Sequence, residues 1–331
     1  MMSPRLDPMV GGLQVRQWGV VLALWGLAVV SPVAAQTTLY WDRANGAGAG
    51  SGATLNGTWD TATSNNWDTT ATGTGGRITY ISGSDAVFSS GTSAIGQTYT
   101  ITVSGTQSAS SISIEEGTVT FSGGTAINLS DATPDFTVAS GLTTNVSTDI
   151  TGTNGLTKLG AGTLVLDTSD KSYTGTTTIS AGTLDLAFNQ SFSTVALAGG
   201  TLKLSSATTS ITNLNITATS TIDFGGANAT LNATNFSISG GVTLNIINWV
   251  NGADFFFATN WTGAVYDATG AAPMNQVVFN SPTFTGSDTK WLPYGNHEIT
   301  PLPEPSTYGA MLLAAATGLI ALRRRVSLRA V

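Results

Sequence analysis

Side chains that could carry out catalysis are sparse in this chain of 331 residues. There is no cysteine and there is one histidine, His297 in GNHEITP, so the sequence offers no thiol nucleophile and no histidine pair for zinc. Two pairs of acids, Asp167 with Asp170 and Glu115 with Glu116, have the residue type that glycosidases use. Because neighbouring acids are common on turns, we expect no enzyme, no catalytic residue, no metal site and no cofactor.

Tryptophans beside aspartates could instead bind a ligand. Trp41, Trp59 and Trp67 lie in YWD, TWD and NNWD, and an exposed indole face near a carboxylate suits a sugar. The alternative, which we favour, is that these rings cover the open end of a repeat structure. Three more tryptophans follow the recurring part of the chain: Trp249, Trp261 and Trp291.

The elements that position these side chains must be built with few charges. Charged residues make up 9% of the chain, against about a quarter in an average soluble domain, and Thr, Ser, Asn and Gly supply the polarity. Threonine favours strands, whereas glycine and asparagine favour turns. This composition predicts an all-β protein.

The N-terminus has the pattern of a secretory signal peptide. Arg5 and Arg16 flank its start, an apolar run WGVVLALWGLAVV follows, and the small residues of SPVAAQ permit cleavage between Ala35 and Gln36. The run is shorter than a typical membrane-spanning helix. We therefore predict that residues 1–35 form a signal helix that is removed on export.

The exported part of the chain is acidic. Residues 36–301 contain six Lys and Arg against 17 Asp and Glu, a net charge of −11, and the cations do not cluster in the sequence. Because binding to a phosphate backbone requires a basic face, we expect no nucleic acid partner.

A short pattern recurs through the middle of the chain. Threonine followed by an aliphatic residue, a variable residue and an apolar residue begins at positions 100, 118, 163, 183, 201, 221 and 243. The intervals are 18, 45, 20, 18, 20 and 22 residues. Since 45 is close to two repeats, we predict a divergent copy within residues 136–146.

Apolar and polar positions alternate within each copy, as in a strand with one buried face. Copies stacked in parallel about 4.8 Å apart would bury that face together. We therefore predict a right-handed parallel β-helix (a β-solenoid) with aromatic-rich terminal caps. One interior ladder would comprise Ile101, Val119, Leu164, Leu184, Leu202, Ile222 and Leu244. Its neighbour would comprise Val103, Phe121, Leu166, Leu186, Leu204, Phe224 and Ile246. On the outer face, Asp185, Lys203 and Asp223 would stack on consecutive strands.

A β-sandwich is the alternative for short strands at regular spacing. Its hairpins favour two-residue Asn-Gly turns. Asn-Gly begins at positions 45, 56, 154 and 251, and among these only position 154 lies within the repeats. We therefore favour the solenoid.

Residues 155–186, GLTKLGAGTLVLDTSDKSYTGTTTISAGTLDL, resemble the autotransporter-associated β-strand repeat. That family has a Lys-x-Gly-x-Gly-Thr-Leu start, a Tyr-Thr-Gly-x-Thr centre and a Gly-Thr-Leu end. The matching residues are Lys158, Gly160, Gly162, Thr163, Leu164, Tyr173, Thr174, Gly175, Thr177, Gly182, Thr183 and Leu184. The resemblance implies a parallel β-helical stalk. Since no translocator barrel follows in the sequence, we do not expect a complete autotransporter.

The C-terminal residues 302–331 combine a Pro-Glu-Pro motif, an apolar segment at 308–322 and three arginines. As a helix the apolar segment would be about 22 Å long, against a hydrocarbon core of about 30 Å. The order of the three parts resembles the PEP-CTERM sorting signal, which in that family is recognised by the membrane protease exosortase. The motif residues would be Pro303, Glu304, Pro305, Arg323, Arg324 and Arg325. The resemblance implies a single transmembrane helix that holds the exported chain until it is cut.

We thus expect a signal peptide, a Trp-rich N-terminal cap at 36–98, β-helical repeats at 99–247, a C-terminal cap at 248–301 and a sorting signal. The expected function is that of an exported bacterial surface or extracellular-matrix protein, anchored first in the inner membrane, with an exosortase, the membrane and an exopolysaccharide as partners. The alternative is a secreted β-helix that binds or cleaves polysaccharide.

Overall fold

The computed structural model describes residues 36–43, 55–89, 92–168, 171–205, 208–225, 228–266, 270–281, 284–286, 289–292 and 297–301. The predicted signal peptide, including Ala35, and the predicted sorting signal lie outside the described residues. In the described part, no helix has the length and apolarity to cross a membrane.

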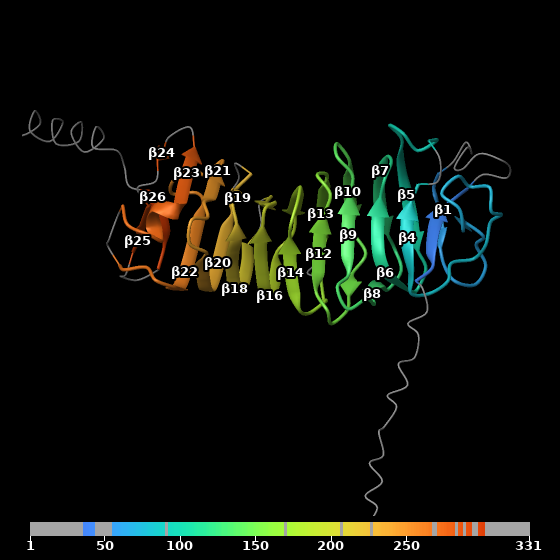
Figure 1. Cartoon of the computed structure of the whole chain (residues 1–331), viewed down its shortest axis with the longest axis horizontal. Helices are drawn as coiled ribbons and strands as arrows, with labels where there is room; N and C mark the ends of the chain where they lie inside the picture. Colours follow the sequence, from blue (N-terminus) through green and yellow to red (C-terminus); the bar gives the residue numbers. More distant parts are fainter. Residues whose placement is uncertain are drawn as a thin grey trace, which may run out of the picture. The chain divides into compact units, whose positions relative to one another are not determined.

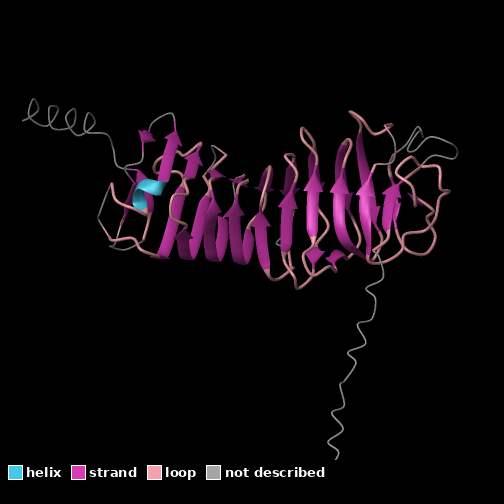
Figure 2. Ribbon diagram, viewed as in Figure 1, coloured by secondary structure: helices cyan, strands magenta, loops and turns pink. Residues whose placement is uncertain are grey.

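The fold is an all-β parallel solenoid, as the repeat spacing predicted, and the parallel pairing excludes the β-sandwich (Figures 1 and 2). The chain passes back and forth between two sheets, so that each turn adds at least one strand to each of them. We call one such turn a rung.

The first sheet, sheet A, has 13 strands. They are β1 (Thr38–Trp41), β3 (Trp67–Asp68), β4 (Ser84–Phe88), β6 (Thr106–Ile114), β8 (Ala126–Leu129), β9 (Asp135–Val138), β11 (Ile150–Thr151), β12 (Leu156–Leu159), β14 (Thr176–Ile179), β16 (Gln190–Ala198), β18 (Thr208–Ala218), β20 (Thr230–Ile238) and β22 (Phe255–Trp261).

The second sheet, sheet B, has 11 strands and contains the recurring threonine pattern. They are β2 (Gly57–Trp59), β5 (Thr98–Val103), β7 (Thr118–Ser122), β10 (Thr143–Val146), β13 (Thr163–Leu166), β15 (Thr183–Leu186), β17 (Thr201–Leu204), β19 (Ser220–Asp223), β21 (Leu244–Ile247), β23 (Val277–Ser281) and β24 (Phe284–Gly286). A short 3-10 helix, η1 (Met274–Gln276), and a hairpin of β25 (Thr289–Trp291) and β26 (Ile299–Pro301) complete the described elements.

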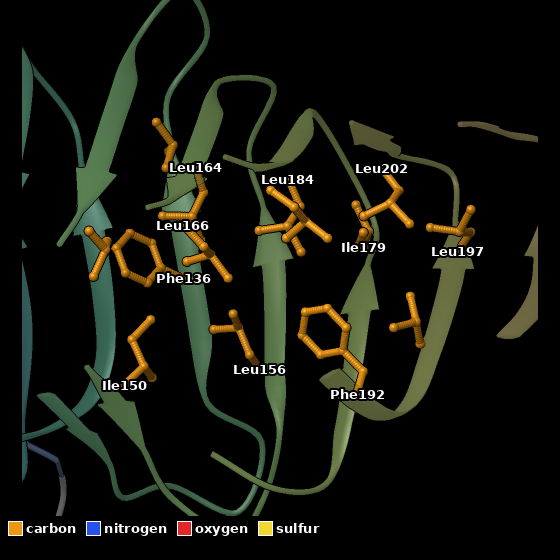
Figure 3. Packing of buried hydrophobic residues seen from close by; sticks show 14 of the residues in the cluster. Phe136, Ile150, Leu156, Leu164, Leu166, Ile179, Leu184, Phe192, Leu197 and Leu202 are labelled. Atoms are coloured by element: carbon orange, nitrogen blue, oxygen red, sulfur yellow. The ribbon is translucent and has the colours of Figure 1, made fainter. Parts of the chain in front are cut away.

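The buried ladder predicted from the sequence is confirmed in the middle of sheet B. Leu184 lies directly opposite Leu164 on one side and Leu202 on the other, and all three side chains are buried between the sheets (Figure 3). The divergent copy is also confirmed, because β10 lies between β7 and β13 and places Thr144 between Val119 and Leu164.

The predicted register is wrong by two residues at two places. Val119 pairs with Tyr99 and not with Ile101, and Ile222 pairs with Ile246 and not with Leu244. Because side chains alternate with a period of two, a two-residue shift leaves the same face inward. All six side chains are therefore buried in spite of the shift.

Glycines make the sharp corners that lead from sheet A to sheet B. Gly160, between β12 and β13, has a φ of 71°, and a Cβ there would collide with the carbonyl oxygen of Val138 in the preceding rung. A Cβ at Gly162 would meet the carbonyl of Ala139 in the same way. These corners can stack at strand spacing because they lack side chains.

Strands outside the predicted repeat range belong to the same two sheets. β1, β2 and β4 precede residue 99 and β22 and β23 follow residue 247, all paired in parallel with their neighbours. At the sheet ends the pairing becomes antiparallel, β3 with β1 and β24 with β23.

Candidate functional site

The lysine of the repeat motif lies inside the solenoid. Lys158 occupies an inward-facing position of β12, between Phe136 and Ile179 on the neighbouring strands, and its side chain is fully buried. Its Nζ donates hydrogen bonds to the carbonyl oxygens of Leu159 at 2.7 Å and Gly160 at 2.8 Å. A third bond, of 3.3 Å, reaches the carbonyl of Ala181 in the next rung.

This ammonium group ties two successive corners of the solenoid together. Burial lowers the pKa of Lys158 to about 8, because the charged form loses its hydration. The three carbonyls replace part of that hydration, and they belong to corners whose glycines leave no room for larger side chains. The lysine and the glycines of the Lys-x-Gly-x-Gly motif therefore act together to hold successive corners against each other.

Of the acidic pairs that the sequence offered for catalysis, the members that the structure describes are in contact with other groups of the protein. The backbone carbonyl of Asp167 accepts a hydrogen bond of 3.0 Å from Nζ of Lys171, which is itself buried, while Asp170 lies outside the described residues. Burial, followed by the charge of Glu116, raises the pKa of Glu115.

The three N-terminal tryptophans are buried, so none of them presents a ring face to a sugar. Trp67 packs against Trp41 and Trp59, with ring centroids 5.2 and 5.6 Å apart. The Trp41 indole donates a 3.0 Å hydrogen bond to the carbonyl of Leu55. These rings fill the space between the sheets at that end.

The aspartates that follow two of these tryptophans organise loops. Burial alone would raise the pKa of Asp60, but hydrogen bonds from the Ser64 hydroxyl and from the backbone amides of Thr63, Ser64 and Ala62 hold it far below its ordinary value. Asp68 accepts bonds from the Thr70 amide and hydroxyl. The carboxylates are thus engaged with their own loops.

The predicted column of alternating charge on sheet B is confirmed in register, since Lys203 lies between Asp185 and Asp223. Lys203 forms its ion pair with Asp185, at 2.8 Å, and Asp185 also accepts a 2.7 Å hydrogen bond from Ser205. Asp223 instead accepts bonds from the Asn248 side chain and the Gly225 amide. The charged side chains of this column are thus engaged with other groups of the protein.

A hollow of about 430 Å³ lies on the outer face of sheet A, across β16, β18, β20 and β22. Sequence reasoning missed it. Two columns of outward-facing residues flank the hollow. The first column is Ser191, Ser210, Asn232 and Phe257, which pair in register. The second column is Ser193, Thr212, Thr234 and Thr259.

The hollow lies where the alternation of inward-facing and outward-facing residues in these strands shifts by one residue. In β16, Phe192 and Val195 both point inward, so two consecutive residues, Ser193 and Thr194, face outward between them. The same change recurs in β18 and β20. The signal in the sequence is the repeated Thr-Asn-apolar triplet that begins at Thr212, Thr234 and Thr259.

The asparagines of these triplets form a ladder beside the hollow. The Asn235 amide donates to Asn213 at 2.9 Å, and the Asn260 amide donates to Asn235 at 3.0 Å. Asn213 in turn donates to the Ser193 carbonyl at 3.3 Å. Each rung is thereby fixed to the next along one wall.

Residues 156–186 match the passenger-associated-transport-repeat. No curated protein and no solved structure matches the chain. The match supports the repeat predicted at 155–186, and its boundaries enclose the Lys158 corner and the Leu164–Leu184 pair. A passenger-associated-transport-repeat within a parallel solenoid indicates an exported, passenger-like surface protein.

Of the predicted processing residues, the structure describes Gln36, whose side-chain amide donates a 3.4 Å hydrogen bond to the carbonyl of Gly83. The Pro-Glu-Pro residues Pro303, Glu304 and Pro305 lie outside the described part of the chain, as do the three arginines from Arg323 to Arg325.

Proposed function

We propose that this protein is a structural component of a bacterial cell surface or extracellular matrix, exported by its signal peptide and sorted by its C-terminal tail. The observation that carries the proposal is the passenger-associated-transport-repeat at residues 156–186, set within a solenoid whose rungs continue in both directions. Such a body presents long outer sheet faces, which suits a spacer or a matrix component.

The route follows from the resemblance of the tail to a PEP-CTERM signal. A short apolar segment at 308–322 followed by arginines would stop in the inner membrane, with its cations on the cytoplasmic side. An exosortase-type protease would then cut the precursor and release the body to the surface, where an exopolysaccharide is its proposed partner.

We propose that the body acts without catalysis. The described residues contain no group of three or more metal-ligating side chains, and the hollow on sheet A is lined by neutral residues. Hydrolysis of a glycan would require a pair of suitably placed carboxylates, and the lining contains none.

Fractionation of the producing cells tests the route. Pro303→Ala combined with Pro305→Ala should leave an uncut precursor in the inner membrane, whereas the wild-type chain reaches the surface. Replacing the three arginines with alanine should weaken membrane retention of the precursor through loss of orientation. Normal surface delivery of both variants would contradict the sorting role.

A further inference from the structure

The hollow across β16, β18, β20 and β22, which we name the sheet A groove, has the chemistry of a binding site. We propose that it binds a neutral polysaccharide chain that lies across the strands. The proposal deepens the exopolysaccharide association under "Proposed function" by assigning a site and a class of glycan.

Charge is the first argument. The four strands contain no Asp, Glu, Lys, Arg or His, although the exported part of the chain carries 17 acids. Recognition of an acidic or basic polymer relies on opposite charges at the site. A groove walled by hydroxyls and amides therefore favours an uncharged ligand that can both donate and accept hydrogen bonds.

The groove also offers unused hydrogen-bonding groups. Within the described part of the chain, the side chains of five lining residues form no hydrogen bond to protein: Ser210, Thr212, Asn232, Thr234 and Thr259. By contrast, the adjacent asparagine ladder is bonded from rung to rung, at 2.9 Å between Asn235 and Asn213. The ladder fixes the wall, and the unbonded groups remain available to a ligand.

An aromatic surface closes the groove at β22. Phe257 lies in the same column as Asn232 and is half-buried, and its ring stacks on that of Phe255 with centroids 5.7 Å apart and an interplanar angle of 9°. Phe257 lines the groove, so its ring provides an apolar surface for the C–H face of a sugar, and the stacking on Phe255 holds that ring in place.

The spacing favours a polymer over a monosaccharide. Hydroxyl and amide groups repeat on successive strands about 4.8 Å apart, so the four strands span about 14 Å. This length accommodates more than one sugar ring. Since no carboxylate lines the groove, a bound chain would be held and not cut.

Isothermal titration calorimetry on the full chain tests the proposal, in a zwitterionic detergent without a sugar headgroup. The probes are the neutral hexasaccharides of glucose, mannose and galactose, with hexagalacturonate as the anionic comparison. We expect saturable binding of at least one neutral hexasaccharide. Phe257→Ala and Thr212→Glu should each weaken it at least tenfold.

Two controls separate binding from folding. Phe257→Tyr keeps the ring and should retain binding, and Phe188→Ala removes an exposed ring that does not line the groove and should leave binding unchanged. The proposal is overturned if none of the neutral probes binds, if hexagalacturonate binds more tightly, or if both groove variants bind as the wild type does. None of these results depends on export or tail cleavage, so they are distinct from failure of the sorting route.

Discussion

Nζ of Lys158 donates a hydrogen bond of 3.3 Å to the carbonyl of Ala181, 23 residues further along the chain and one rung away. The same nitrogen bonds two carbonyls of its own corner. A fully buried lysine in a solenoid core is costly unless its ammonium is bonded in this way. Because burial lowers the pKa of this group, stability depends on pH.

The first prediction concerns that dependence. The pKa of Lys158 is about 8 in the folded chain and about 10.4 when unfolded, so between these values the unfolded chain binds more protons. The free energy of unfolding should therefore rise with pH in this window, by at most about 1.4 kcal/mol per unit, relative to Lys158→Met. Urea unfolding of both proteins from pH 7 to 10.5 measures the difference, and a constant difference would refute the assignment.

The second prediction concerns the corner glycines. Gly160 and Gly141 both have positive φ, of 71° and 76°, but a Cβ at Gly141 would meet nothing within 4 Å. Gly141→Ala should cost about 1 to 2 kcal/mol for the backbone conformation alone. Gly160→Ala should cost a further 1 to 3 kcal/mol or so because it also collides with Val138. Equal urea midpoints for Gly160→Ala and Gly141→Ala would mean that Gly160 does not lie against Val138 of the preceding rung.

The third prediction compares neighbouring residues on opposite faces of β15. Leu184 is fully buried, so Leu184→Asp should destabilise the body by about 3 to 5 kcal/mol, as an uncompensated buried charge does. Asp185→Asn removes one partly exposed ion pair, worth up to about 1 kcal/mol. Thermal unfolding of the two variants distinguishes the faces, and similar melting temperatures would contradict the alternation.

The fourth prediction concerns acid. The pKa of Asp60 is lowered in the folded state, so its stabilising contribution is present above the unfolded value of about 3.9 and is lost as pH falls below it. At pH 7, Asp60→Asn should cost about 1.5 to 3 kcal/mol, as loss of hydrogen bonds to a charged group does. The difference from wild type should shrink as the pH falls below about 4.

Asp135 provides a control of opposite sign when the free energies of unfolding of wild type and variant are compared across pH. Burial, followed by the charges of Asp131 and Asp85, raises its pKa, so Asp135→Asn should not destabilise the body at neutral pH. If Asp60→Asn and Asp135→Asn responded alike to acid, the loop hydrogen bonds around Asp60 would not be the cause.

The repeat spacing predicted much of sheet B, because a buried face must recur at one position in every rung. It predicted the Leu164, Leu184 and Leu202 ladder and the divergent strand β10. It did not predict the pairing of Val119 with Tyr99, since a two-residue shift preserves which face is buried and so leaves no trace in the apolar pattern.

The sheet A groove was harder to find. In β16, buried and exposed residues alternate strictly up to Phe192 and again from Val195, but in the opposite phase. A single two-residue period therefore fits only one half of the strand at a time. For the Trp-Asp pairs, the burial of the rings agrees with the favoured reading as a cap and not with the sugar-binding alternative. Their residue types suit a sugar, but the rings are buried and the Asp60 carboxylate is bonded to its own loop.

The central claim, that the chain is an exported surface protein sorted by its tail, is tested most directly by intact-mass and terminal-peptide analysis of the protein recovered from the cell surface. The account predicts a chain that begins at Gln36 and lacks the apolar segment 308–322 together with Val331. A mature surface protein that retains Val331 would show that the tail is a permanent anchor and would contradict the sorting route.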